Sequence, residues 1–428
     1  MGLIINIDEA LKNRSEYNVL GEPLNKMLSD IQEAWERSNP IDMIFNRTSM
    51  STFQETYTST IGFNHAFRET ADYAVGPIFN TAEGFSATFR TRTFQGGFII
   101  TRQVIEDRQY GKAKDDANAF IRRWHGDVVE YAIASLAGGF GSKYYWGEGG
   151  GSYTQATAGE GASMLTLTSA DTVDGDITNT TKNPLFYKNH TTVKRGTSGT
   201  VTYQSNIFAV KKSSTEIGLT IGGDDAGQIS KLADIINQVI TIMENYRDDN
   251  GKRAGVIGPK TIVCGNDPHL KSAIATALST DTFKQGETMF PNPAKDRATM
   301  ETSPYFLDIP QCENGNGFFI VDKAYNAANH GLELTERIPL TLEVFDHREA
   351  PQGIKYEGRQ RFDINVASWR GVTYVYLGTG STTGTDWNYN GNGTLTSANF
   401  TVLTPVETIV RPVSVTGIGG VVTTSSAT

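Results

Sequence analysis

Cysteine and long apolar runs are both scarce in this sequence. Only Cys264 and Cys312 are present, too few for a disulfide framework, so we expect two buried thiols in a reducing compartment. No uninterrupted apolar segment approaches the roughly 20 residues that span a bilayer, so no membrane helix is predicted. The first residues, MGLIINIDEALKNR, lack the basic start and apolar centre of a signal peptide. We therefore expect a cytoplasmic site of synthesis.

Positive charge is also in deficit. The chain has 38 Lys and Arg against 47 Asp and Glu, a formal net charge of -9. Affinity for nucleic acid comes mainly from basic side chains that release counterions, so this balance excludes a dedicated nucleic-acid binder and leaves weak, non-specific contact. The six histidines are scattered without the spacing of metal ligands, and we expect no metal ion and no cofactor.

Apolar residues recur at helical spacing in several segments. Pro23 is expected in the first turn of a short amphipathic helix over 23–37. A longer helix is expected over 115–137, with Trp124 and Tyr131 in its apolar stripe and His125 on its polar side. Further helices are expected over 228–246 and from Pro268 onward, the latter after a buried strand, TIVCG.

The segment FSATFRTRTFQGGFIITRQVI at 85–105 has the alternation of a long two-faced strand, and it contains arginines but no carboxylate. With ETYTSTIGFNHAFRE at 55–69 it predicts a long antiparallel ribbon in which Gly96 and Gly97 mark a bend or bulge. Spacing alone leaves two alternatives open: the ribbon reaches a neighbouring subunit, or it is a half-exposed hairpin on its own domain. From residue 332 the pattern is strand after strand, and VETIVRPVSV at 406–415 is the last strand expected.

Candidate sites for chemistry are weak. Asp386, Asn388 and Asn390 match the opening positions of an EF-hand calcium loop, but the twelfth position is not Glu, which favours an Asn-Gly turn. Cys264 and His269 are close in sequence, yet Cys264 falls in an apolar strand and no third group orients the pair. The sequence therefore does not predict an enzyme.

The order of these elements resembles the major capsid proteins of tailed bacteriophages, the family named after phage Hong Kong 97. Two stretches carry the local likeness, the run from TFQGGFIITRQ at 93 to SLAGG at 139 and TIVCGNDPHLKSAIATAL at 261–278. The resemblance implies an α+β fold built from an N-arm (1–50), an E-loop with flanking strands (51–112), a P-domain spine helix (113–139), a β-rich insertion or extended arm (140–224), an A-domain (225–345), closing strands of the P-domain (346–378) and a Gly/Thr-rich C-terminal extension (379–428).

The resemblance also implies a function. It implies a structural protein that self-assembles as pentamers and hexamers into an icosahedral shell enclosing double-stranded DNA, in the host cytoplasm. Its partners would be further copies of itself, a separate scaffolding protein, a portal and cement proteins, with no membrane contact. The residues expected in contacts between subunits are Phe89, Arg90, Arg92, Phe94 and Arg102 of the E-loop and Arg370 in the SWRG turn.

Two other classes stay open. A tail-tube or baseplate protein would share the strand-rich, Gly/Thr-rich composition, but the long helix after a long ribbon disfavours it. An α/β hydrolase needs a nucleophile elbow such as G-x-S-x-G, which the sequence lacks.

Overall fold

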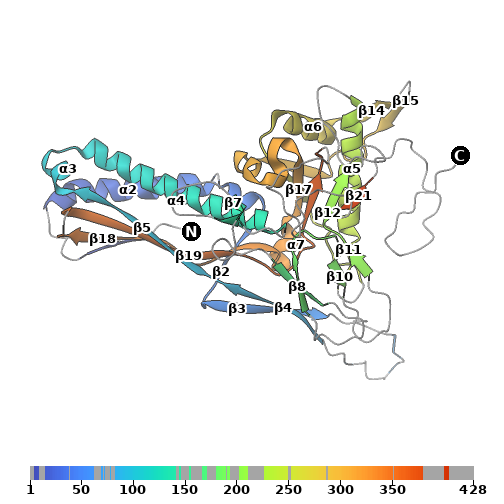
Figure 1. Ribbon diagram of the computed structural model, residues 1–428, viewed down its shortest axis with the longest axis horizontal. Coiled ribbons are helices and arrows are strands. Elements are labelled where there is room, and N and C mark those ends of the chain that lie inside the picture. The colour runs from blue at the N-terminus through green and yellow to red at the C-terminus, as the bar shows by residue number, and fades with distance from the viewer. Residues whose placement is uncertain are drawn as a thin grey trace.

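The computed structural model describes residues 4–8, 15–37, 39–61, 69–70, 72, 78, 82–140, 144–145, 154–155, 166–170, 180–188, 190–192, 202–210, 226–248, 252–285, 288–349, 351–378 and 400–403. These residues form a long arm and a compact lobe (Figure 1). Helices and mostly antiparallel sheets occur together, which confirms the expected α+β class. Among the described helices, none is long and apolar enough to cross a membrane.

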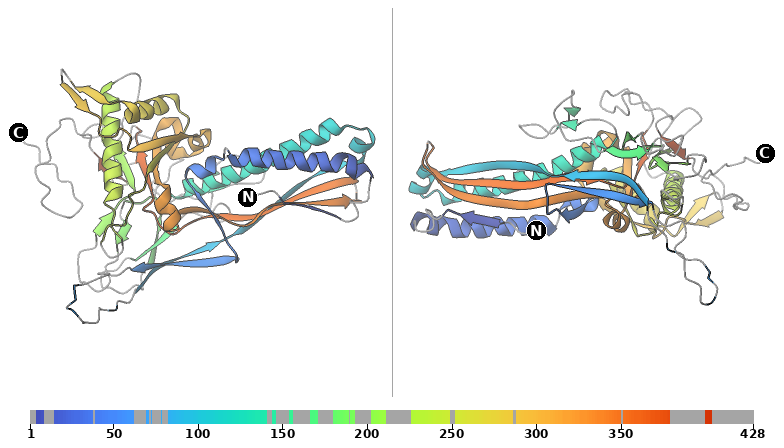
Figure 2. Two further views of the ribbon diagram at one scale, coloured as in Figure 1. Left: turned by 180° about the vertical axis from the view of Figure 1, so that it is seen from behind. Right: turned by 90° about the horizontal axis from the view of Figure 1, so that it is seen from below.

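The arm is a five-stranded sheet with two long helices on one face (Figures 1 and 2). Its strands follow the order β1 (Ile4–Ile7), β18 (Leu332–His347), β19 (Gly353–Val366) and β5 (Arg92–Thr101), and β2 (Asn46–Ser49) also pairs with β18. The helices are α2 (Ser15–Arg37) and α4 (Tyr110–Gly138), and the short α3 (Arg102–Glu106) connects β5 to α4. No described helix covers the other face of this sheet, which we call the open face.

The apolar periods of the sequence explain this layer. Leu28 of α2 and Ile121 of α4 are fully buried, and they belong to one apolar cluster with Leu342 and Tyr356 of the sheet. Burial of each such side chain contributes about 1.5–3 kcal/mol. The helices are therefore held to the sheet mainly by this apolar seam.

Gly96 and Gly97 do not bend β5. Both keep regular register with β19, where Gly97 lies opposite Glu357. A Cβ atom on Gly97 would lie 2.5 Å from the backbone oxygen of Tyr356, and one on Gly96 would lie 3.3 Å from the Trp124 ring. The expected bend is wrong, and these glycines instead permit close approach of strand to strand and of sheet to helix.

The lobe is a six-stranded sheet packed against helices α5 (Ala226–Glu244) and α6 (Pro268–Ser279). The rings of Phe140, Phe186, Phe319 and Tyr374 contact one another in its core, with Phe140 stacked on Phe186 and Tyr374 edge-on to Phe140. Its strand order is β16 (Ala298–Thr302), β13 (Lys260–Cys264), β17 (Gly317–Asp322), β20 (Val372–Tyr376), β12 (Ile207–Val210) and β21 (Thr401–Leu403).

The remaining strands form two-stranded pairs. The largest is the hairpin of β3 (Gln54–Ile61) and β4 (Ala82–Arg90), which lies below the arm sheet in Figure 1. The other pairs are β6 (Tyr144–Tyr145) with β7 (Thr154–Gln155), β8 (Thr166–Ala170) with β9 (Thr180–Pro184), β10 (His190–Thr192) with β11 (Thr202–Gln204), and β14 (Thr282–Gln285) with β15 (Thr288–Pro291). The short helices are η1 (Pro40–Met43), η2 (Pro304–Asp308), η3 (Pro310–Gly315) and α7 (Lys323–Ala328).

Some local expectations are wrong. Helix α2 begins at Ser15, so Pro23 lies inside it rather than in its first turn. The strand expected over 85–105 is interrupted at Thr91, because β4 pairs with β3 whereas β5 pairs with β19. Strand β20 belongs to the segment expected to close the P-domain, and it pairs with β17 and β12 in the lobe sheet; the domain assignment of this segment stays a prediction. The segment boundaries themselves stay predictions, and the strand expected at 406–415 lies outside the described residues.

Candidate functional site

The β3–β4 hairpin is held to the arm at its base by an aromatic cluster. The ring of Tyr57 on β3 stacks on that of His330, with centroids 3.9 Å apart. Phe89 on β4 is 1% exposed and packs against both rings. His330 connects α7 to β18 and has a φ of 49°, in the left-handed region. We call Tyr57, Phe89 and His330 the aromatic latch.

A buried carboxylate supports the latch from the arm side. Glu333 of β18 is fully buried, and its Oε2 accepts a hydrogen bond from Thr48 Oγ1 at 2.9 Å while its Oε1 lies 3.2 Å from His330 Nδ1. Burial raises the pKa of Glu333, and these two partners act against that rise. Burial also raises the pKa of Tyr57 to about 12, with Glu55 adding to the effect. The latch therefore joins both hairpin strands to β2 and β18.

The hairpin has no third strand among the described residues, where β3 and β4 pair only with each other. An isolated two-stranded ribbon is marginally stable, and free strand edges are templates for pairing with another chain. The outer edges of both hairpin strands are therefore unpaired within the described part of the chain.

Trp124 and Tyr131 of α4 both point toward the arm sheet. Trp124 Nε1 donates a hydrogen bond to Gln360 Oε1 at 2.8 Å, and Gln360 Nε2 donates one to the buried Glu336 at 2.8 Å. Tyr131 is 3% exposed, and its hydroxyl donates to Asp363 Oδ1 at 2.6 Å. Both side chains therefore lie between the long helix and the arm sheet.

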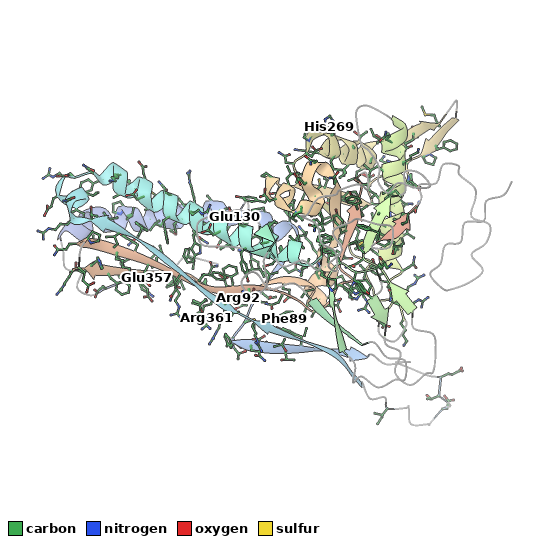
Figure 3. The ribbon with its side chains drawn as sticks, in the orientation of Figure 1. Phe89, Arg92, Glu130, His269, Glu357 and Arg361 are labelled. Atoms are coloured by element: carbon green, nitrogen blue, oxygen red, sulfur yellow. The ribbon has the colours of Figure 1, made fainter. Side chains whose placement is uncertain are left out.

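Three of the residues predicted at subunit contacts are engaged inside their own chain. Phe89 is part of the latch, Phe94 stacks on Phe362 with centroids 4.6 Å apart, and Arg92 Nε lies 3.2 Å from Asp363 Oδ2. Figure 3 shows Phe89 and Arg92 along the lower side of the arm, near the base of the hairpin. Contact with a second subunit stays a prediction for these residues.

The other three predicted contact residues lie apart. Arg90 Nε donates a hydrogen bond to Gln54 Oε1 at 3.1 Å, beside the base of the hairpin. Arg102 lies at the opposite end of β5, where it is 68% exposed and pairs with Glu106 at 2.6 Å. Arg370 lies in the lobe, donates to the backbone oxygen of Arg247 and covers the Trp369 ring. The structure therefore does not bring the six predicted residues into one site.

His125 is buried, and its expected place on the polar side of the long helix is wrong. It is 5% exposed, and its ring stacks on that of Trp35 of α2 at 4.8 Å and 16°. The pKa of His125 is lowered to about 4, mainly by burial; Glu36 acts against this shift and Arg47 adds to it. Its spacing of four residues from the buried Ile121 was a signal for this position.

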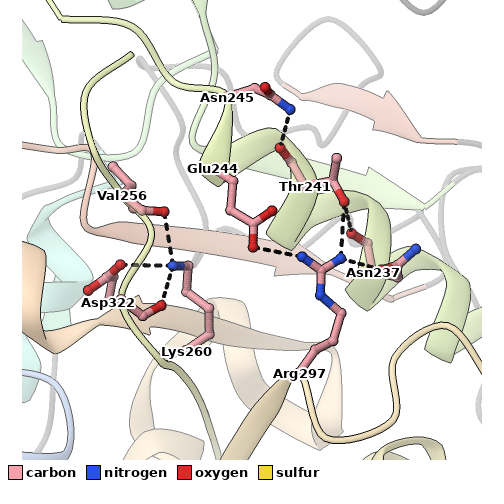
Figure 4. A network of polar contacts seen from close by, with 9 residues as sticks. Asn237, Thr241, Glu244, Asn245, Val256, Lys260, Arg297 and Asp322 are labelled. Carbon is pink, nitrogen blue, oxygen red and sulfur yellow. Dashed lines mark hydrogen bonds and ion pairs between the residues drawn. The ribbon is translucent and has the colours of Figure 1, made fainter.

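Sequence reasoning also missed a buried ion pair in the lobe, shown in Figure 4. Lys260 Nζ donates to Asp322 Oδ2 at 2.8 Å, and both side chains are at most 2% exposed. The backbone oxygens of Val256 and Gly258 accept further hydrogen bonds from Lys260, while Asp322 Oδ1 accepts one from the backbone N–H of Tyr325. This pair ties two neighbouring strands to the start of α7. Its only sequence signal was an aspartate in front of a helix.

A second polar network in Figure 4 joins Arg297, the residue before β16, to α5. The guanidinium of Arg297 donates hydrogen bonds to Glu244 at 2.7 Å, to Thr241 at 3.2 Å and to Asn237. These partners follow one face of α5 at helical spacing, so the network fixes the helix against the edge strand.

The described residues contain no group of three or more His, Cys, Asp or Glu side chains placed to hold a metal ion. Cys264 is buried, which raises the pKa of its thiol to about 12, and burial also raises that of Cys312. His269 is exposed on α6 (Figure 3). Asp386, Asn388 and Asn390 lie outside the described residues.

No protein family model and no curated protein sequence matches this chain. Solved structures do match, among them the capsid of the cyanophage P-SCSP1u, with a TM-score of 0.40 and 9% identity over 78% of this chain and 86% of that one. The mature capsid of bacteriophage PhiM1 gives the same values. A virus-like particle from Pyrococcus furiosus has a TM-score of 0.39 and 8% identity over 83% of this chain and 98% of that one.

Proposed function

We propose that the chain is the major capsid protein of a tailed bacteriophage, with the Hong Kong 97-like fold. Its copies assemble as pentamers and hexamers into an icosahedral shell that encloses double-stranded DNA. The role is structural rather than enzymatic, and the protein resides in the virion capsid after assembly in the host cytoplasm.

One observation carries this proposal. A two-stranded hairpin, anchored at its base by the aromatic latch, extends away from the arm, and the arm sheet has an open face. Both features need a partner, since free strand edges and an uncovered sheet face are otherwise prone to irregular aggregation. Two different surfaces of a subunit can form a head-to-tail contact between neighbouring copies. Such contacts close into a ring when the rotation from one copy to the next allows it. The geometry therefore favours a subunit of a ring-based assembly.

The partners follow from this role. A separate scaffolding protein, a portal and cement proteins would guide and complete the shell. The net charge of -9 supports weak, non-specific contact with the enclosed DNA, because a strongly basic lining would hold phosphates tightly.

Electron microscopy and light scattering of the expressed chain test the proposal. Closed shells, or rings of five and six copies, are the expected products. If tubes form, their lattice symmetry is determined from the images. A lattice of stacked rings would support a tail-tube protein instead. A chain that stays monomeric at high concentration, and also with coexpressed phage scaffolding proteins, would contradict the proposal.

A further inference from the structure

The imidazole of His330, in the aromatic latch, contacts both an aromatic ring and a carboxylate. The ring of Tyr57 stacks on it, with centroids 3.9 Å apart and 30° between the ring planes. Its Nδ1 lies 3.2 Å from Oε1 of Glu333. The side chain of Glu333 is fully buried, whereas that of His330 is 38% exposed. The imidazole can therefore exchange a proton with solvent, while the charge of its partner stays inside the arm.

The backbone that carries this imidazole is fixed to the arm. The carbonyl oxygen of His330 accepts a hydrogen bond from the N–H of Ala367 at 2.8 Å, and the N–H of Gly331 donates to the oxygen of Asn326 at 2.9 Å. The φ of 49° at His330 directs the chain sharply from α7 into β18. A side chain on such a backbone cannot follow the hairpin when the hairpin moves. The hold on β3 and β4 therefore depends on how strongly the latch rings attract one another.

Both contacts of the imidazole become stronger when it carries a positive charge. Its contact with Glu333 then becomes an ion pair, and a cation over an aromatic face is attracted by the electrons of the ring. The hydroxyl of Tyr57 donates a hydrogen bond to Oε2 of Glu55 at 2.9 Å, so a second carboxylate lies next to the stacked ring. This hydrogen bond lowers the pKa of Glu55, which keeps that carboxylate ionised. The other contacts, Phe89 of β4 on the imidazole and Thr48 of β2 on Glu333, are uncharged.

We propose that the aromatic latch is a proton-operated joint, which holds the hairpin firmly when His330 is charged and loosely when it is neutral. Histidine is the side chain whose charge ordinarily changes between about pH 5 and pH 8. The stability that a histidine gains from a carboxylate partner is complete in mild acid and is lost as the pH rises. Burial raises the pKa of Glu333, so stronger acid protonates this carboxylate and ends the ion pair from the other side. The hairpin is therefore held most firmly in mild acid and is released as the pH rises.

Amide hydrogen exchange of the unassembled, full-length chain at pH 6 and pH 8 tests the joint. Rates are expressed as protection factors, which removes the intrinsic effect of pH on exchange, and β18 and β19 serve as the internal reference. Glu333→Gln removes the charge but keeps an oxygen that can accept the hydrogen bond of Thr48. The matched control, Glu343→Gln, removes a carboxylate from the same strand, where it lies opposite Glu357. Circular dichroism at both pH values confirms that each variant is folded.

In wild type and in the control, the protection of β3 and β4 should be at least about threefold higher at pH 6 than at pH 8. Glu333→Gln should lose most of this gain. His330→Asn, a residue that tolerates the left-handed backbone, should lower the protection of both strands at both pH values and show no gain. Equal protection of wild type at the two pH values, or a Glu333→Gln variant with the full gain, would overturn the inference. The proposed function is tested on assembled particles, so it stands or falls independently of either outcome.

Discussion

The buried His125 predicts that acid weakens the packing of α2 on α4. Burial between the two helices lowers its pKa to about 4 from 6.5. When folding lowers the pKa of a basic side chain, its contribution to stability is complete above the pKa of the unfolded state. For His125 this contribution is lost as the pH falls from 6.5, the ordinary pKa, toward about 4, the pKa in the folded chain. That gap corresponds to about 3 kcal/mol at most, because one pKa unit equals about 1.4 kcal/mol.

The measurement is urea unfolding of the unassembled chain at intervals between pH 7 and pH 4. The substitution His125→Phe keeps an aromatic ring against Trp35 but removes the titrating group. We expect wild type to lose up to about 3 kcal/mol more than this variant over that interval. The control is His269→Gln, because His269 is exposed on α6. A wild-type pH profile parallel to that of His125→Phe would refute this reasoning.

Three further predictions concern stability and the hairpin. Gly97→Ala places a Cβ atom 2.5 Å from a backbone oxygen and should lower the free energy of unfolding in urea by about 1–3 kcal/mol. In Gly126→Ala the added Cβ atom meets no atom within 4 Å, and this variant should raise the free energy of unfolding by about 0.5–1 kcal/mol. Equal effects of the two substitutions would contradict the close packing at Gly97. Lys260→Met leaves the buried Asp322 unpaired and should lower the free energy of unfolding by about 3–5 kcal/mol. Adding Asp322→Asn to this variant should recover part of that loss in the same assay. If no stability is recovered, an unpaired charge is not the cause of the loss. Tyr57→Ala should speed amide hydrogen exchange throughout β3 and β4. Tyr57→Phe keeps the ring stacked on His330, so the amides of both strands should exchange at the wild-type rate. Similar exchange rates in the two variants would show that the latch does not hold the hairpin.

Local pattern predicted the long elements well, because their signals are periodic and their lengths leave few alternatives. The helix expected over 115–137 is observed as α4, and the helix expected from Pro268 begins there, capped by Asp267. Arg123 and Asp127 lie four residues apart on this helix, a spacing that allows an ion pair, and their side chains are 2.7 Å apart.

What the sequence could not predict are contacts made across long separations. Thr91 ends one strand pairing and begins another, although the alternation of apolar residues continues through it. Arg361 of β19 lies over the ring of Phe53, which comes from the other end of the chain, so no local window contains this contact. The same holds for Glu333 and Thr48, which belong to neighbouring strands that only the folded sheet brings together.

The chain passes from hairpin to arm sheet through the single residue Thr91, and this has a mechanical consequence. A pull on the far end of the hairpin is carried along the backbone into β5, whose pairing with β19 extends from Arg92 to Thr101. Tension along a paired strand loads its hydrogen bonds together in shear rather than opening them one at a time. The joint should therefore transmit tension from the hairpin into the body of the arm without separating the strands of the sheet one hydrogen bond at a time.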